Sequence, residues 1–400
     1  MANISTKAQQ MPASAIRKLV PFADAAKKEG VKVYHLNLGQ PDIKSPECAL
    51  AAIKNYSAAN ISYSHSGGLM ELRKGLVDKY YRKIGIDINV DELIVTVAGS
   101  ESVNLALEIA CDPGDEVLVL EPFYTNYNTF AFMNKLTLKA IATDIRNGFQ
   151  IPPIEEFEKA ITPKTKAILI CNPGNPTGTQ YSKESMLALG EIARKHDLFL
   201  LSDEVYREFC YTDEPHFSAM NIPGLEQNVI LIDSVSKRYN LCGARIGCIV
   251  SHNKDVMAAV MKFAQARLCA PVLGQMAAIG ALDTPDCYFD AVKEEYIRRR
   301  DYMIERLNQM EGVFTPLPMG AFYTIAELPV DDTEKFAKWM LENFRIDNET
   351  TMVTPAASFY KTPGMGKNHA RIAYVLEVEE LKKALHILEE GLKAYPGRTL

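Results

Sequence analysis

The segment 234–247, Ser-Val-Ser-Lys-Arg-Tyr-Asn-Leu-Cys-Gly-Ala-Arg-Ile-Gly, combines a lysine with groups that could bind a phosphate. It follows a short apolar run that predicts a buried strand. A lysine just beyond a strand end can act as a fixed amine nucleophile, or condense with an aldehyde as a Schiff base. Ser234, Ser236 and Arg245 supply the donors that a phosphate requires. The segment therefore favours a reactive Lys237 over an ordinary surface loop.

A glycine-containing turn elsewhere in the chain could bind the same anion. The run 92–97 predicts a strand, and Ala-Gly-Ser-Glu at 98–101 leads into a helical pattern. A helix that begins at such a turn offers free N–H groups and the positive end of its dipole to an anion. Gly99, Ser100 and Glu101 are therefore candidate cofactor-binding residues, although turns of this kind are common in α/β proteins.

An aspartate and a tyrosine follow another predicted strand. The run 198–202 ends at Asp203, and Tyr206 comes three residues later. A buried carboxylate is costly unless it is paired, so Asp203 at a strand end requires a partner. The alternative is that Asp203 caps a helix, a position that aspartate favours.

The predicted strands between residues 93 and 250 alternate with helical stretches. This alternation predicts an α/β fold with a mostly parallel sheet and crossover helices. The candidate residues lie at strand ends or in the loops just after them, where open α/β sheets bind ligands. A chain of 400 residues is also longer than one hydrophobic core usually organises, which favours two domains.

Four motifs occur in an order that resembles the class I/II aminotransferases, fold-type I enzymes that use pyridoxal 5′-phosphate. They are Ser-x-x-Lys with Gly-x-Arg-x-Gly in 234–247, Asn-Pro-Thr-Gly at 175–178, Asp-x-x-Tyr at 203–206 and Leu-Gly-x-Pro-Asp at 38–42. The resemblance extends over nearly the whole chain. It implies a large domain with a mostly parallel seven-stranded sheet flanked by helices, and a smaller α+β domain.

The resemblance also implies where the domains divide. Residues 1–45 would form an N-terminal arm and part of the small domain, residues 46–295 the large cofactor-binding domain, and residues 296–400 the small C-terminal domain. Family members hold the bonds that match Glu121–Pro122 and Asn175–Pro176 in the cis form, so we expect one or both to be cis.

The resemblance assigns cofactor contacts residue by residue. In the family, the lysine at the position of Lys237 holds the cofactor as an internal aldimine and moves the proton from the substrate Cα. The position of Asp203 pairs with the pyridinium nitrogen. Asn175 and Tyr206 would contact the 3-oxygen of the pyridine, and the ring of Tyr124 would stack on it. A core aromatic residue is the alternative for Tyr124.

The same comparison indicates how the substrate and a second subunit bind. Gly39 and Arg371 would hold the α-carboxylate of the substrate, with Asn175 beside it and Phe322 of the Gly-Ala-Phe-Tyr strand nearby. An edge-strand position on the surface is the alternative for Arg371. Tyr63 would contact the cofactor phosphate of the neighbouring subunit, which implies a homodimer with shared active sites.

The implied reaction moves an α-amino group from an aspartate-, glutamate- or aromatic-type amino acid to a 2-oxo acid such as 2-oxoglutarate. A β-eliminating C–S lyase of the same fold would keep every cofactor residue, so it is the main alternative. A cofactor-domain regulator or a purely structural α/β domain is a weaker one. Some aspartate-specific relatives carry a lysine where this chain has Ser100, while Ile16-Arg17-Lys18-Leu19 is similar to aromatic-preferring relatives.

The composition argues against several other classes. A net charge of −6 does not fit a nucleic-acid partner, and the cluster Arg298–Arg300 is flanked by acids, which predicts a solvated helix face. No run is apolar enough to span a bilayer. The eight cysteines are scattered and include no Cys-x-x-Cys pair. We therefore expect no metal site and a reducing, cytoplasmic location.

Overall fold

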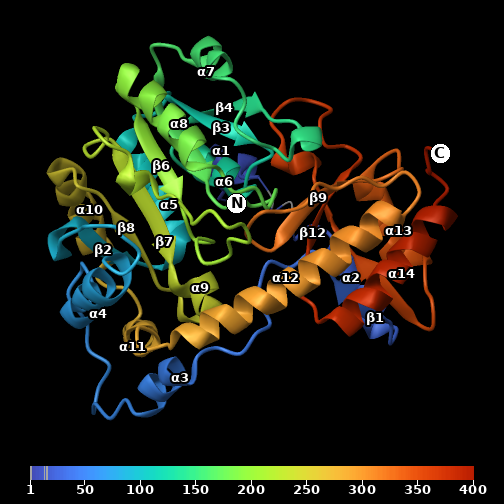
Figure 1. Cartoon of the computed structure of the whole chain (residues 1–400), viewed down its shortest axis with the longest axis horizontal. Helices are drawn as coiled ribbons and strands as arrows, with labels where there is room; N and C mark the ends of the chain where they lie inside the picture. Colours follow the sequence, from blue (N-terminus) through green and yellow to red (C-terminus); the bar gives the residue numbers. More distant parts are fainter. Residues whose placement is uncertain (1, 13, 15–16) are drawn as a thin grey trace.

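The computed structural model describes residues 2–12, 14 and 17–400, and its largest element is a seven-stranded sheet. All neighbouring strands of this sheet are parallel except that β8 is antiparallel to both β2 and β7. The mostly parallel sheet confirms the predicted fold class (Figure 1). In spatial order the strands are β2 (Leu93–Thr96), β8 (Gly247–Val250), β7 (Val229–Ser234), β6 (Phe199–Asp203), β5 (Thr165–Cys171), β3 (Glu116–Glu121) and β4 (Thr137–Ala142).

Helices cover both faces of this sheet, so its central strands are apolar throughout rather than alternating. Every residue of β7, for example, is buried. One face packs against α3 (Glu47–Lys54), α4 (Met70–Gly75), the π-helix η1 (Leu76–Tyr81), α7 (Ile154–Ala160), α8 (Lys183–Lys195) and α11 (Val272–Ala281). The other packs against α5 (Ala98–Ala110), α6 (Asn126–Met133) and α10 (Lys254–Arg267).

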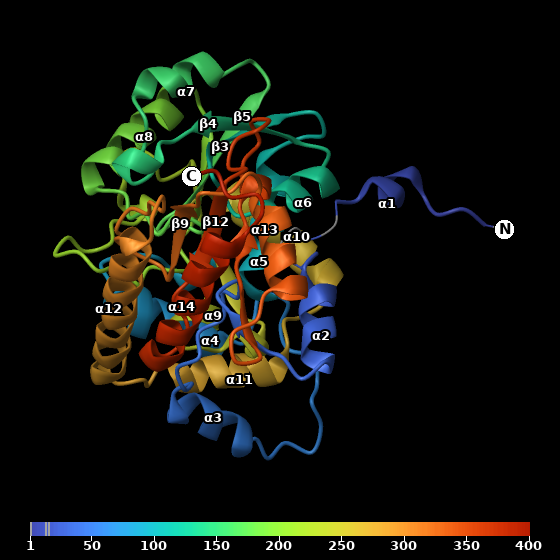
Figure 2. The ribbon, with the colours of Figure 1, turned by 90° about the vertical axis from the view of Figure 1, so that its right-hand side faces the viewer.

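A second hydrophobic core joins the two ends of the chain. It contains a parallel pair, β1 (Lys32–His35) and β10 (Glu349–Met352), and an antiparallel sheet of β11 (Thr354–Pro355), β12 (His369–Ala373) and β9 (Tyr323–Glu327). The helices of this core are α2 (Val20–Lys28), α12 (Asp286–Gln309), α13 (Thr333–Asn343) and α14 (Val378–Ala394). The short α1 (Thr6–Gln10) buries no residue and projects from the surface (Figure 2), where Lys7 donates to the carbonyl of Met133 in α6 at 2.8 Å.

One long helix connects the two cores. Helix α12 runs from the side of the seven-stranded sheet into the second core without a break (Figure 1). The predicted boundary between residues 295 and 296 falls inside this helix, and the division into domains stays a prediction. Arg299 and Arg300 of α12 are only 3% and 8% exposed, so the predicted solvated face is wrong for both. Arg299 is buried because it binds Asp42 and Glu295.

A buried carboxylate links the two cores beside the strand ends. Glu121, the last residue of β3, accepts hydrogen bonds from the backbone N–H groups of Lys361 (2.6 Å) and Thr362 (3.0 Å) in the loop before β12. The backbone N–H of Phe123 also donates to the carbonyl of Phe359 at 2.9 Å. These bonds fix β12 relative to the sheet.

Two backbone predictions are confirmed, and one bond was not foreseen. Glu121–Pro122 and Asn175–Pro176 are both cis, and Asn172–Pro173 is cis as well. Within the described residues, no helix is long and apolar enough to cross a membrane.

Candidate active site

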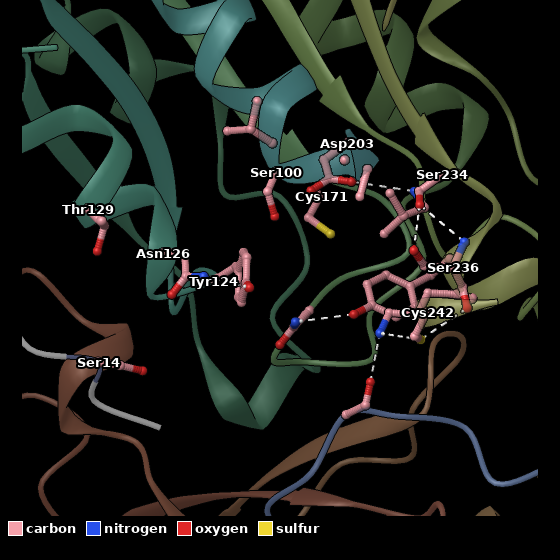
Figure 3. A pocket seen from close by; sticks show the side chains of 18 of the residues that line it. Ser14, Ser100, Tyr124, Asn126, Thr129, Cys171, Asp203, Ser234, Ser236 and Cys242 are labelled. Atoms are coloured by element: carbon pink, nitrogen blue, oxygen red, sulfur yellow. Dashed lines mark hydrogen bonds between the residues drawn. The ribbon is translucent and has the colours of Figure 1, made fainter. Parts of the chain in front are cut away.

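A cavity of about 850 Å³ lies at the carboxyl ends of β5, β6 and β7, between the two cores. It brings together all but three of the predicted site residues: Gly39, Gly99, Ser100, Tyr124, Asn175, Asp203, Tyr206, Ser234, Ser236, Lys237, Arg245 and Arg371. Figure 3 shows Asp203 between Tyr124 on one side and Ser234 and Ser236 on the other. The strand ends and the second core therefore enclose one site.

Lys237 occupies the helical turn α9 (Val235–Arg238) that follows β7 directly. Ser234 caps this turn, because its hydroxyl accepts a hydrogen bond from the N–H of Ser236 at 3.1 Å. The Nζ of Lys237 reaches across the cavity and donates to the carbonyl of Gly39 at 2.7 Å. Burial lowers the pKa of Lys237, and the nearby charges of Arg371 and Arg245 lower it further. The amine is thus more easily deprotonated than an exposed lysine.

A chain of hydrogen bonds connects the Gly39 carbonyl to Asn175. The hydroxyl of Tyr323 donates to the carbonyl of Gly39 at 3.4 Å and lies 3.1 Å from the hydroxyl of Tyr206. The side-chain amide of Asn175 donates to Tyr206 at 3.3 Å. Residues from four distant parts of the chain therefore hold one another in the cavity wall.

Arg371 completes this chain from the central strand of the three-stranded sheet. Its Nη1 donates to the side-chain oxygen of Asn175 at 3.2 Å, and its Nη2 donates to the carbonyl of Asn37 at 2.8 Å. The residue is 2% exposed, its Nε has no partner, and no carboxylate of the described residues forms an ion pair with it. A surface position on an edge strand is therefore wrong. A buried guanidinium without a carboxylate partner is suited to a substrate carboxylate.

Asp203 ends β6 and faces the cavity without capping a helix. Its Oδ2 accepts a hydrogen bond from the hydroxyl of Tyr127 at 2.8 Å, and its Oδ1 has only the N–H of Val205, at 3.4 Å. Burial raises the pKa of Asp203 to about 6, against the effect of these two donors. A cationic N–H in the cavity would restore the charged form.

Another part of the cavity wall is lined by hydroxyl and N–H donors. Gly99 and Ser100 lie in the first turn of α5, and the hydroxyls of Ser234 and Ser236 lie close by. Gly247 allows this approach, because a Cβ there would lie 2.7 Å from the backbone nitrogen of Gly99. Arg245 adds a guanidinium, which the donation of its Nη1 to the Cys242 carbonyl at 2.9 Å holds in place. The set is suited to a phosphate.

Three predicted residues lie outside the cavity wall. Tyr63 is 81% exposed, and Glu101 binds the N–H of Val97 and the guanidinium of Arg267 instead. Phe322 is buried in the second core, and its neighbour Tyr323 lines the cavity in its place. Consecutive residues of a strand point to opposite sides, so only one of Phe322 and Tyr323 can face the cavity. Tyr323, which carries a hydroxyl, was the better candidate for a polar cavity.

Buried charges lie directly behind the site. Glu204 accepts from Arg207 at 2.6 Å, and Arg207 lies 3.6 Å from Asp233. Asp233 accepts two hydrogen bonds from Arg238, at 2.6 and 2.8 Å, and Arg238 continues to Glu208 at 2.7 Å. Negative and positive groups therefore alternate along one connected row. We refer to these five residues as the buried ion row.

The comparisons with known proteins agree with this geometry. Residues 31–388 match the family model described as aminotransferase class I and II. The chain belongs to this family. It is 30% identical over 391 residues to the aspartate/prephenate aminotransferase of Thermus thermophilus, covering 96% of this chain and 97% of the relative. It is 32% identical over 391 residues to the aspartate aminotransferase of Pyrococcus horikoshii, covering 95% of each.

Solved structures of aminotransferases share the fold. The structure of the Thermus thermophilus aspartate aminotransferase with maleate has a TM-score of 0.89 at 30% identity, over 98% of this chain and all of the relative. The alanine aminotransferase of Pyrococcus furiosus has a TM-score of 0.88 at 31% identity, with the same coverage. The predictions of family, fold and aminotransferase activity are thus confirmed.

Pyridoxal 5′-phosphate is the cofactor of this family, and the cavity fits it. Donors suited to a phosphate, the buried carboxylate of Asp203 and the amine of Lys237 line one continuous space. Tyr124 adds a half-buried aromatic ring to the same wall. In the described part of the chain, no group of three or more His, Cys, Asp or Glu side chains could hold a metal ion.

We predict that Asp233→Asn destabilises the protein by about 3–5 kcal/mol, since it removes the anion that the buried guanidinium groups of Arg207 and Arg238 share. Burial alone would raise the pKa of Asp233, but Arg238 and Arg207 hold it below its ordinary value of 3.8. The stabilisation is therefore full above a pH of about 5 and declines as the pH falls through the folded pKa. Urea unfolding at several pH values measures this difference. Asp87→Asn, at an exposed position, is the control, and equal stability of the two variants would contradict the prediction.

Proposed function

We propose that this chain transfers the amino group of a dicarboxylic amino acid to a 2-oxo acid, with Lys237 as the group that moves the proton at the substrate Cα. The observation that carries the proposal is the single cavity that contains the amine of Lys237, the buried carboxylate of Asp203 and the unpaired guanidinium of Arg371. When bound, pyridoxal 5′-phosphate supplies an aldehyde for the substrate amine and a ring that accepts the electron pair left on Cα.

The residues around the ring would keep it in its reactive form. Asp203, as a carboxylate, would hold the proton on the ring nitrogen, and Asn175 and Tyr206 would donate to the ring oxygen. Tyr124 would cover one face of the ring. The lowered pKa of Lys237 supports its part, because a neutral amine can accept the proton from Cα and return it to the former aldehyde carbon of the cofactor.

The phosphate and the substrate carboxylate would bind to different cationic groups of the cavity. Gly99, Ser100, Ser234, Ser236 and Arg245 would bind the phosphate, and Arg371 would bind the α-carboxylate through two parallel hydrogen bonds. These anchors fix the Cα proton relative to Lys237. The relatives named above are aminotransferases, which favours amino transfer over β-elimination. Release of pyruvate and ammonia without a 2-oxo acid would select the lyase instead.

The charges of the cavity favour a substrate with a second carboxylate. Lys237, Arg245, Arg371 and Arg17 line it, and Asp203 is the only carboxylate of the described lining. The phosphate accounts for Arg245 and the α-carboxylate for Arg371, so the exposed Arg17 remains for a further anion. The Thermus thermophilus relative was solved with maleate, a dicarboxylate, which supports this choice. Ile16, which precedes Arg17 in the aromatic-type segment, lies outside the described residues.

We also propose a homodimer in which Tyr63 completes the phosphate site of the neighbouring subunit. Tyr63 is too exposed to serve its own cavity and does not line it. Ile61, at 60% exposed, lies in the same loop, so the loop exposes two large side chains. A partner subunit that covered this loop would bury both side chains.

A reducing compartment, the cytoplasm, is our proposal for the location. The support is that all eight cysteines are free. Several of them, such as Cys248, are buried among apolar side chains, where a thiol serves as a small hydrophobe.

Lys237→Ala should lower kcat by more than about 10³-fold, because the variant loses the amine that moves the Cα proton. Steady-state assays with glutamate or aspartate as donor measure this loss. Lys164→Ala is the control, since Lys164 is exposed at the start of β5, away from the cavity. Near-normal turnover by Lys237→Ala would overturn the proposed function.

Arg17→Leu should lower kcat/KM for aspartate and glutamate roughly tenfold, the loss expected for one partly solvated charged hydrogen bond. The rates with alanine and phenylalanine should not change. Single-turnover half-reactions, followed by the absorbance of the cofactor, separate the donors. Lys18→Leu is a matched control, because Lys18 is a neighbouring cation that pairs with Glu334 outside the cavity. An equal effect on all four amino acids would reject Arg17 as a reader of the second carboxylate.

Mixed dimers test the shared site. A Lys237→Ala chain and a Tyr63→Phe chain, folded together, should give one site with both defects and one with neither. The intact site should bind the cofactor with wild-type affinity, whereas the Tyr63→Phe homodimer should be about tenfold to a hundredfold weaker. If the lysine-containing site of the mixed dimer keeps the weak affinity, Tyr63 acts within its own chain.

A further inference from the structure

We propose that Tyr127 is a positioning residue that holds Asp203 as a carboxylate against the cofactor ring nitrogen. Tyr127 lies in α6, is 1% exposed and does not line the cavity. Its hydroxyl nevertheless donates to Oδ2 of Asp203 at 2.8 Å. The proposal rests on the part given to Asp203 in the proposed function.

Asp203 has few other groups to keep it charged. The N–H of Val205 is a distant second donor, at 3.4 Å, and no arginine or lysine of the described residues pairs with the carboxylate. Burial and the neighbouring Asp233 and Glu204 all favour the neutral acid. The Tyr127 hydroxyl therefore donates the strongest hydrogen bond that stabilises the Asp203 carboxylate before a ligand binds.

Tyr127 can serve only as a donor toward this carboxylate. Burial, and then the adjacent carboxylate, raise its pKa well above the ordinary value of 10.0, so the hydroxyl keeps its proton at any working pH. With Oδ2 engaged from behind, Oδ1 is the oxygen with the weaker bond. The arrangement leaves Oδ1 for a ring N–H in the cavity.

The ring of Tyr127 also supports Tyr124. The two rings meet edge to face, with centroids 5.5 Å apart and an interplanar angle of 85°. Tyr127 further stacks against Phe123, with centroids 6.4 Å apart. One buried side chain thus stands behind both proposed contacts to the pyridine, the stacking ring and the carboxylate. Tyr127→Phe removes the first bond to Asp203 and keeps this ring packing.

The test compares two ligands of the full-length apoprotein. One is pyridoxal 5′-phosphate, and the other is its analogue with carbon in place of the ring nitrogen. Equilibrium dialysis gives the ratio of the two dissociation constants, which reports the contribution of the ring nitrogen alone. Wild type should prefer the natural cofactor, and Tyr127→Phe should reduce this preference about tenfold. Thermal unfolding of the apoproteins checks that the variant is folded.

Two further variants make the readout specific. Tyr374→Phe loses an equally buried hydroxyl, which donates to the carbonyl of Ala321 at 3.2 Å outside the cavity, and its ratio should equal that of wild type. Asp203→Asn should remove the preference, and adding Tyr127→Phe to it should change the ratio no further.

The possible results distinguish a failure of the role of Tyr127 from a failure of the role proposed for Asp203. If Tyr127→Phe weakens both ligands equally, the tyrosine is only structural and the proposal is overturned. If wild type itself shows no preference, Asp203 does not meet the ring nitrogen, and both the proposed part of Asp203 and this proposal fail. A reduced ratio in Tyr127→Phe that disappears in the Asp203→Asn background supports it.

Discussion

The strand ends that carry Asp203, Ser234 and Lys237 depend on the pairing of charges that are buried beneath the cavity. An unpaired charge in a protein interior costs several kcal/mol, so each member of the buried ion row depends on the opposite charge or charges next to it. The row also has a particular relation to the sequence. Glu204 follows Asp203, Arg207 follows Tyr206, Asp233 precedes Ser234, and Arg238 follows Lys237. Satisfying the charges therefore fixes the strand ends that carry the chemistry.

The tyrosines of η1 also contact the buried ion row. The hydroxyl of Tyr81 donates to Asp233 at 2.8 Å, and the guanidinium of Arg238 lies 3.5 Å from the ring centre of Tyr80. The π-helix η1, the strand β7 and the turn α9 are thus joined by polar contacts. Apolar packing alone would allow these elements to slide past one another. Such contacts are directional, and they give a cavity floor of defined shape.

Much of the fold and the site could be predicted from the sequence because the signals are local. Strands that are buried on both faces appear as apolar runs, as in β7. A lysine or aspartate directly after such a run must lie at the carboxyl end of the strand. Asp203 and Lys237 were found in this way, although the number of strands, seven, came from the family resemblance.

The rest could not be predicted because it depends on contacts between distant segments. Nothing near Tyr127 in the sequence indicates that its hydroxyl meets Asp203, and nothing near Arg299 indicates that Asp42 buries it. Phe322 and Tyr323 are adjacent, and the packing of Phe322 in the second core leaves Tyr323 facing the cavity. The neighbours that we propose for Tyr63 belong to a second subunit.

The pairing of β1 with β10 has a consequence for how the protein is made. Lys32–His35 emerges from the ribosome long before the strand beside it, Glu349–Met352, has been made. The seven-stranded sheet between them can assemble from neighbouring segments while synthesis continues. Strand β1 therefore lacks this partner until β10 has been made. Arg371 follows β10 in the chain, so the cavity wall cannot be complete before β12 has been made.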